Sequence, residues 1–216
     1  MLKFNRNKTR GDTLIEVLFA ITIFSLVAVG GLAIMNQGTA TSQRALEITL
    51  VRQEVDAQAE TLRFLNSSYI SAYQTGALSY PSSPPAEQWR LMQSSIIAMA
   101  ALDVTPFGID PDNPTVCPTA PAGSFILNTR TATFIPSTSG KLGISQTFSQ
   151  VRYDISNQVT TSEGLWIEAV RSATVSGNNQ ENAGYIDFHI RACWDSPGQS
   201  VPVTIGTIVR LYEPRG

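Results

Sequence analysis

The stretch that decides the fold is Arg10-Gly11-Asp12-Thr13-Leu14-Ile15-Glu16-Val17-Leu18, which stands at the start of a long apolar run. The run continues to Met35, and Glu16 is its single charged residue. As a helix, the 22 residues from Leu14 to Met35 would cover about 33 Å, enough to cross a bilayer core of about 30 Å. An ionisable group inside such a span costs roughly 2.5–3.5 kcal/mol, so we expect Glu16 to have a partner and a role.

The charges on either side of the apolar run predict its orientation in a membrane. Residues 1–11 contain four cations and no acid, and the next cation after the run is Arg44. Because positive charge is retained on the cytoplasmic side, the N-terminus is expected inside and the rest of the chain outside. A secretory signal would be cut after a shorter apolar core, so this run fits a membrane anchor better.

The order of these features resembles the class III signal of prepilins, the precursors of type IV pilins and of type II secretion pseudopilins. The resemblance covers about 25 residues and rests on the basic leader, on Gly11 and on the tetrad Thr13-Leu14-Ile15-Glu16. It implies that a prepilin peptidase cleaves between Gly11 and Asp12, which makes Glu16 the fifth mature residue. Asp12 departs from the aromatic residue or Met usual at this position, so N-methylation of the new terminus stays open.

The same resemblance implies a function, a location and partners. The protein is expected to be held in the cytoplasmic membrane by a single pass. An assembly platform and its ATPase would then polymerise it, through the N-terminal helix, with other pilin subunits into an extracellular filament. Such a major or minor pilin would serve surface adhesion, twitching motility or DNA uptake. The alternatives are a type II secretion-type pseudopilin and an uncleaved single-pass surface protein that binds a ligand.

Within the helix, the resemblance assigns roles to one carboxylate and two glycines. Glu16 would neutralise the N-terminal amine of an adjoining subunit. Gly30 and Gly31 each weaken a helix by about 1 kcal/mol relative to Ala, and they would mark the segment that loses helicity in the filament. The alternative for the glycines is a close packing contact with a neighbouring helix.

The remaining pattern predicts an α+β fold in which a long N-terminal helix packs on an antiparallel sheet. One helix is expected over about residues 13–71, because no proline occurs before Pro81 and apolar residues from Val51 to Tyr69 recur every three or four positions. A shorter helix is expected from Pro85, with Ile96, Ile97, Met99, Ala100 and Leu102 on its apolar side. The expected regions are the leader 1–11, the transmembrane and assembly helix 12–36, and an extracellular head 37–216 made of an amphipathic helix 37–75, a proline-rich loop region 76–123 and a β-sheet 124–216.

Alternating apolar and polar residues predict the strands of the sheet, about four to six in number. The expected strand segments are 125–127, 131–135, 147–155, 164–171, 185–194 and 203–212. The amphipathic part of the long helix is expected to cover one face of this sheet.

Two cysteines in an exported domain predict one disulfide, between Cys117 and Cys193. It would close a loop of 76 residues and stabilise the fold by about 4 kcal/mol in a chain-entropy treatment. The alternative is two free thiols.

Composition and motifs predict neither an enzyme nor a bound cofactor or metal. His189 is the only histidine and is expected to be an ordinary surface or edge residue. One histidine and two cysteines are too few ligands for a His/Cys zinc site, and the sequence contains no Gly-x-Ser-x-Gly elbow. Asp110-Pro111-Asp112-Asn113 fits a turn better than a calcium site. Removal of the four leader cations changes the formal charge from −2 to −6, so no specific nucleic-acid partner is predicted.

Overall fold

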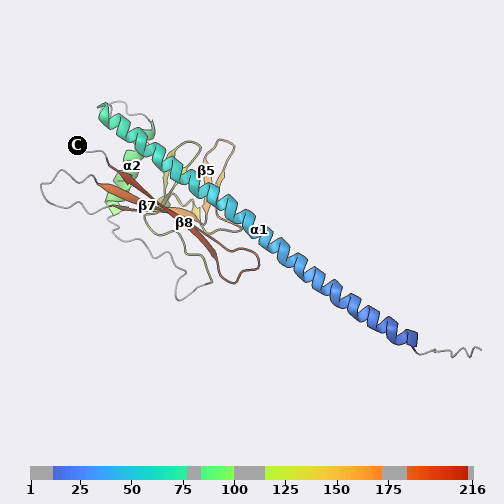
Figure 1. The fold of residues 1–216 in the computed structure, drawn as a ribbon. Coiled ribbons are helices and arrows are strands. Elements are labelled where there is room, and N and C mark those ends of the chain that lie inside the picture. Colours follow the sequence, from blue (N-terminus) through green and yellow to red (C-terminus); the bar gives the residue numbers. More distant parts are fainter. Residues whose placement is uncertain (1–11, 77–83, 100–114, 172–183, 214–216) are drawn as a thin grey trace, which may run out of the picture. The chain divides into compact units, whose positions relative to one another are not determined.

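The computed structural model describes residues 12–76, 84–99, 115–171 and 184–213 (Figure 1). Two compact units divide the chain after Ala45, and helix α1, Asp12–Gln74, begins in the first unit and ends in the second. The second unit, from Leu46 onward, contains all the strands that the structure describes and is called the head below.

Helix α1 is continuous over 63 residues, so the prediction of a single long helix is confirmed. In the head its apolar stripe is buried as expected, and the buried residues are Val51, Val55, Ala59, Leu62 and Leu65. The spacing of three and four places these side chains on one face of the helix. The helix ends in a turn at Gly76, whose φ of +71° is a conformation that glycine adopts without strain.

Helix α2, Pro84–Met99, begins one residue before the predicted start. Its described buried apolar residues are Ala86, Trp89, Met92 and Ile96, so burial of Ile96 is confirmed and the other three are additions to the predicted apolar side. The indole of Trp89 is fully buried and packs near Tyr69 and Phe188 at centroid distances of 6.3 and 5.8 Å. The side chains of Ile97 and Met99, together with Ala100 and Leu102, lie outside what the structure describes.

The main sheet is antiparallel, with five strands in the order β2-β1-β6-β7-β8. Its strands are β1 Phe125–Asn128, β2 Thr133–Pro136, β6 Leu165–Arg171, β7 Tyr185–Trp194 and β8 Val203–Tyr212. Strands β6, β7 and β8 pair along their length, whereas β1 pairs with β6 only at Phe125↔Ile167. The predicted α+β fold with an antiparallel sheet is therefore confirmed, and β1 separates from β6 after its first residue.

A second, smaller sheet was not predicted. It has the order β3-β5-β4, with β3 Leu142–Gly143, β4 Gln150–Tyr153 and β5 Val159–Glu163. Strand β3 is parallel to β5, and β4 is antiparallel to it. A short 3₁₀ turn, η2 Ser137–Ser139, precedes this sheet.

One hydrophobic core joins both helices to the sheets of the head. The buried side chains of α1 and α2 lie in the same cluster as those of β1, β6 and β7, among them Phe125, Ile167 and Phe188. Burial of this apolar surface is the main source of stability for the head.

Candidate functional site

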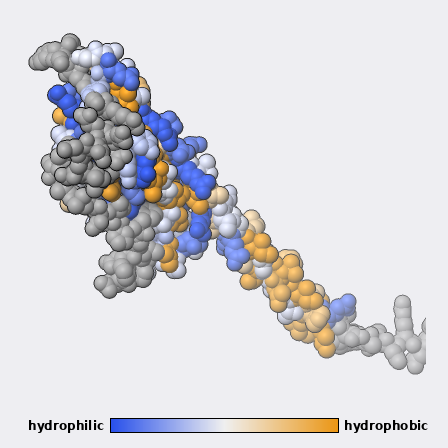
Figure 2. Space-filling view, turned by 60° about the vertical axis from the view of Figure 1, so that its left-hand side comes forward, coloured by the Kyte–Doolittle hydropathy of each residue, from blue (hydrophilic) through white to orange (hydrophobic). Residues whose placement is uncertain are grey.

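The N-terminal half of α1 has an apolar surface that no other part of its own compact unit covers. Every side chain described between Leu14 and Thr39 is exposed, and Phe24 and Leu26 keep 74 and 77 % of their surface accessible. Figure 2 shows this half of the helix as a band of hydrophobic residues. It is long and apolar enough to cross a membrane. An apolar surface of this extent is expected to be covered by lipid or by other chains.

Within the apolar run from Leu14 to Met35, both side-chain hydroxyls bond to carbonyls of the helix itself. The hydroxyl of Thr22 donates to the carbonyl of Phe19, and that of Ser25 donates to the carbonyl of Ile21. Among the described residues, Glu16 has no hydrogen-bond or ion-pair partner. The carboxylate is therefore the polar group of this surface that needs a partner from outside the chain.

The predicted signal residues lie at the beginning of α1. The helix begins at Asp12, directly after the predicted cleavage bond, and Gly11 lies outside the described residues. Thr13, Leu14 and Ile15 belong to the first turns, and Leu14 and Ile15 are exposed.

The predicted weak points, Gly30 and Gly31, lie in unbroken helix. A Cβ atom added at either position, or at Gly38, would meet nothing within 4 Å. Packing inside this chain therefore does not require glycine at these positions, and a loss of helicity in a filament stays a prediction.

Within the head, polar contacts join the C-terminal part of α1 to the strands. The Glu47 carboxylate accepts hydrogen bonds from the Trp194 indole (3.1 Å) and the Ser196 hydroxyl (2.7 Å). Farther along the helix, the Asn66 amide donates to the carbonyl of Tyr212 at 3.3 Å. The helix and strand β8 therefore run in the same direction, since Trp194 lies opposite Val203 at the start of β8 and Tyr212 is its last residue.

Gln58 takes the place of a missing strand partner. Its side chain is fully buried, its amide donates to the Leu127 carbonyl (2.9 Å), and its carbonyl accepts the Leu127 N–H (3.0 Å). These backbone groups need a partner because β1 pairs with β6 only at Phe125.

Glu54, one turn before Gln58, is a partly buried acid whose charge is only partly compensated. Its Oε1 atom is buried and has no hydrogen-bond partner among the described residues. Burial raises the pKa of this carboxyl, and the hydrogen bond from Gln58 and the charge of Arg130 only partly oppose that effect.

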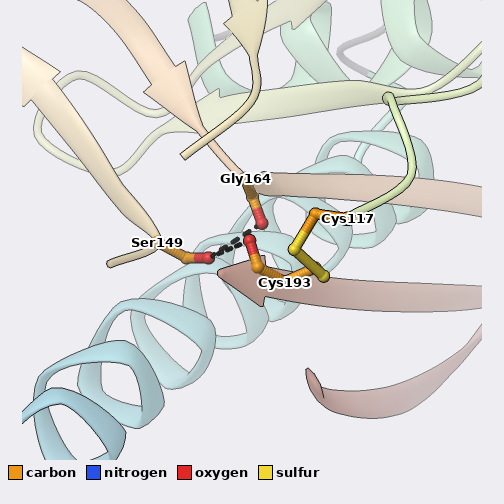
Figure 3. Close-up of a disulfide and its surroundings, with 4 residues drawn as sticks. All are labelled: Cys117, Ser149, Gly164 and Cys193. Carbon is orange, nitrogen blue, oxygen red and sulfur yellow. Dashed lines mark hydrogen bonds between the residues drawn. A yellow bond between two sulfur atoms is a disulfide. The ribbon is translucent and has the colours of Figure 1, made fainter. Parts of the chain in front are cut away.

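The predicted disulfide between Cys117 and Cys193 is present, with a Cα–Cα distance of 5.6 Å (Figure 3). Both cysteines are buried and contact Trp166 on the face of the sheet opposite the main core. The bond attaches the proline-rich region to the end of β7.

Two residues beside the disulfide escaped sequence reasoning. The Ser149 hydroxyl lies 3.0 Å from the carbonyl oxygens of both Gly164 and Cys193 (Figure 3). Gly164 has a φ of +63°, and a Cβ atom there would lie 2.3 Å from the Cys193 carbonyl oxygen. The glycine is therefore required by both its conformation and its surroundings.

His189 lies on the inner strand β7, not at an edge as the prediction allowed. It shares the outer face of the sheet with Asp187 and Arg191, and it is partly buried. Burial, together with the charge of Arg191, lowers the pKa of its imidazole. An open depression lined by residues of α1, Pro85 and the β1–β2 turn does not include His189. The candidate calcium stretch, residues 110–113, lies outside the described residues.

Comparison with known proteins supports the predicted signal at the beginning of the chain. Residues 6–32 match the family described as the prokaryotic N-terminal methylation motif. The matched segment contains the leader cations from Arg6 onward, the predicted cleavage bond and Glu16. No curated protein and no solved structure matches the chain.

Proposed function

Because residues 6–32 carry the class III signal of type IV pilin-like proteins, we propose that the chain is a structural subunit of a type IV pilus-like filament. A prepilin peptidase would remove residues 1–11, and an assembly platform with its ATPase would move the subunit from the cytoplasmic membrane into an extracellular filament. The filament would serve adhesion, motility or DNA uptake. We propose no catalytic role and no cofactor for the head.

The observation that carries this proposal is the combination of a fully exposed apolar helix with one carboxylate near its beginning. Lipid can cover the apolar side chains before assembly, and the helices of neighbouring subunits can cover them afterwards. Neither environment solvates Glu16, so the carboxylate favours a position where a cation is available. The α-amine created by cleavage before Asp12 is such a cation, and on a neighbouring subunit it would pair with Glu16.

A cleavage experiment tests the first step of the proposal. Mass spectrometry of the membrane protein is expected to show a chain that begins at Asp12, and Gly11→Ala is included as the cleavage-blocked variant. An intact leader on functional surface protein would instead support an uncleaved single-pass protein.

An assembly experiment tests the role of Glu16. Glu16→Ala is expected to insert and to be cleaved normally but to be absent from sheared filaments, whereas Glu16→Asp retains some incorporation. Thr22→Ala is the matched control, because the Thr22 hydroxyl bonds only within its own helix. Normal incorporation of Glu16→Ala would refute the pairing. The filament type is also tested here, since incorporation only into a secretion-system filament would identify a pseudopilin.

A further inference from the structure

Among the described residues, strand β8 has no partner on one of its two edges, which forms one long edge of the main sheet. It pairs with β7 along all ten of its residues and is the last strand in the sheet order. The Glu213 N–H bonds to the Gly184 carbonyl, so the odd-numbered residues of β8 bond to β7 and the even-numbered ones direct their backbone groups away from it. Among the described residues, the outward backbone groups of Gly206, Ile208 and Arg210 have no partner.

The opposite edge of the same sheet is protected. Strand β2 has only four residues and ends at Pro136, which has no N–H to offer. Helix α2 lies against β2, and the Gln88 side chain accepts the Phe134 N–H at 2.9 Å. Natural proteins usually shield sheet edges in these ways. In the part of the chain that the structure describes, β8 is therefore the edge of the main sheet that is available for pairing.

The one charge on the open edge is already neutralised. The Arg210 guanidinium makes two hydrogen bonds of 2.7 Å to Asp187 and lies 4.0 Å from the centre of the Tyr185 ring. These contacts hold Arg210 toward β7. It therefore does not repel an incoming strand as a free edge charge would.

We propose that β8 pairs antiparallel with β8 of a second copy of this chain, in a register centred on Ile208. Ile208, which is 61 % exposed, then faces Ile208 of the second copy, and each Arg210 faces a Gly206, which has no side chain of its own to oppose it. The three free residues of each strand form six backbone hydrogen bonds across the pair. Neighbouring registers place Ile208 opposite Gly206 or Arg210 instead, so the apolar pair is lost.

The antiparallel register also fixes the direction of the head helices in the pair. Within the head, the segment of α1 from Glu47 to Asn66 runs in the direction of β8, so in the pair these two segments run in opposite directions.

Register-specific cross-linking tests the pairing in the full chain. The detergent concentration is kept high enough that each micelle contains one chain. Under mild oxidation, Ile208→Cys is expected to form a covalent dimer with itself. Gly206→Cys and Arg210→Cys are each expected to stay monomeric alone and to cross-link when mixed, because each residue faces the other across the pair. The native cysteines do not interfere, since they are buried in a disulfide.

Charge substitution gives a second readout. Ile208→Lys places like charges opposite each other and is expected to weaken dimer formation at least about tenfold. Ser200→Lys adds the same charge at an exposed residue outside the strand and is the matched control. If Ile208→Lys does not fold, the cross-linking of the cysteine variants alone tests the proposed pairing.

Three results would overturn the proposal: cross-linking of Gly206→Cys with itself, no cross-linking of any variant, or undiminished dimers of folded Ile208→Lys. None of these experiments needs a filament. A failure of pairing is therefore distinguishable from a failure of the filament function, which the Glu16 variants test.

Discussion

Gly164→Ala is expected to destabilise the head strongly, because a methyl group there has no space. The added Cβ atom would lie 2.3 Å from the Cys193 carbonyl oxygen and 2.9 Å from both Ser145 Cβ and Ser149 Oγ. The Cys193 oxygen and Ser145 Cβ are fixed by the backbone and cannot rotate away, and Ser149 Oγ can do so only by giving up its hydrogen bonds. The alanine would also occupy the left-handed region, which costs about 1–2 kcal/mol by itself.

The control for this substitution is Gly140→Ala. Gly140 has a φ of +70°, close to the +63° of Gly164, but a Cβ atom there would meet nothing within 4 Å. Gly140→Ala is therefore expected to cost only the conformational term of about 1–2 kcal/mol. Overpacking against Cys193 and weakening of the Ser149 hydrogen bonds add about 2–3 kcal/mol at Gly164.

The free energy of unfolding can be measured in the full chain by denaturant titration in detergent, with tryptophan fluorescence as the signal. All three tryptophans belong to the head and are buried, so the signal reports the head and not the exposed helix. If the two alanine variants differ by less than about 0.5 kcal/mol, the close approach to β7 has no energetic consequence and the reasoning is wrong.

Three further substitutions test other contacts of the head. Glu54→Gln is expected to raise the free energy of unfolding at pH 8 by about 1 kcal/mol, because it removes a partly buried carboxylate whose buried Oε1 atom has no hydrogen-bond partner among the described residues. Since the pKa of Glu54 is raised in the folded state, the destabilising effect of this carboxyl is absent below its pKa in the unfolded chain and grows as the pH rises from there through its folded value. Denaturation at pH 4 should therefore show a smaller gain in the free energy of unfolding for Glu54→Gln. An equal gain at pH 4 and pH 8 would contradict the assignment. Gln58→Ala leaves the N–H and C=O of Leu127 without partners, so it is expected to lower the free energy of unfolding by about 2–4 kcal/mol in the same titration. A decrease below about 0.5 kcal/mol would mean that β1 finds other partners. Replacing both Cys117 and Cys193 by serine is expected to lower the free energy of unfolding by up to about 4 kcal/mol. Reduction of the disulfide in the native chain should lower it by a matching amount. Unchanged stability would show that the bond does not constrain the unfolded chain.

The elements with strong periodicity could be predicted from the sequence. The long helix was expected over residues 13–71 and is found at 12–74, and the last two strands have the predicted bounds. Strand β5 was missed because Val-Thr-Thr-Ser-Glu contains a single apolar residue and no alternation. It forms a strand because β3 and β4 pair with it on both sides, which is tertiary information.

The candidate site divides in a similar way. Glu16 and the disulfide could be found from the sequence, because a charge in an apolar run and a pair of cysteines stand out against their surroundings. Gln58, Ser149 and Gly164 could not, because each acts on backbone groups of residues distant in the chain. Gln58 contacts Leu127, 69 positions away, and nothing in its neighbourhood on the helix indicates that partner.

The disulfide has a mechanical consequence for a head pulled between α1 and its C-terminal end. Residues 117 and 193 lie on either side of 76 peptide units, which stay closed in a loop even after the rest of the head has unravelled. Those units would otherwise add about 250 Å of contour length. A stretched head therefore lengthens much less than a reduced one, and the bond acts as a limit on extension under load.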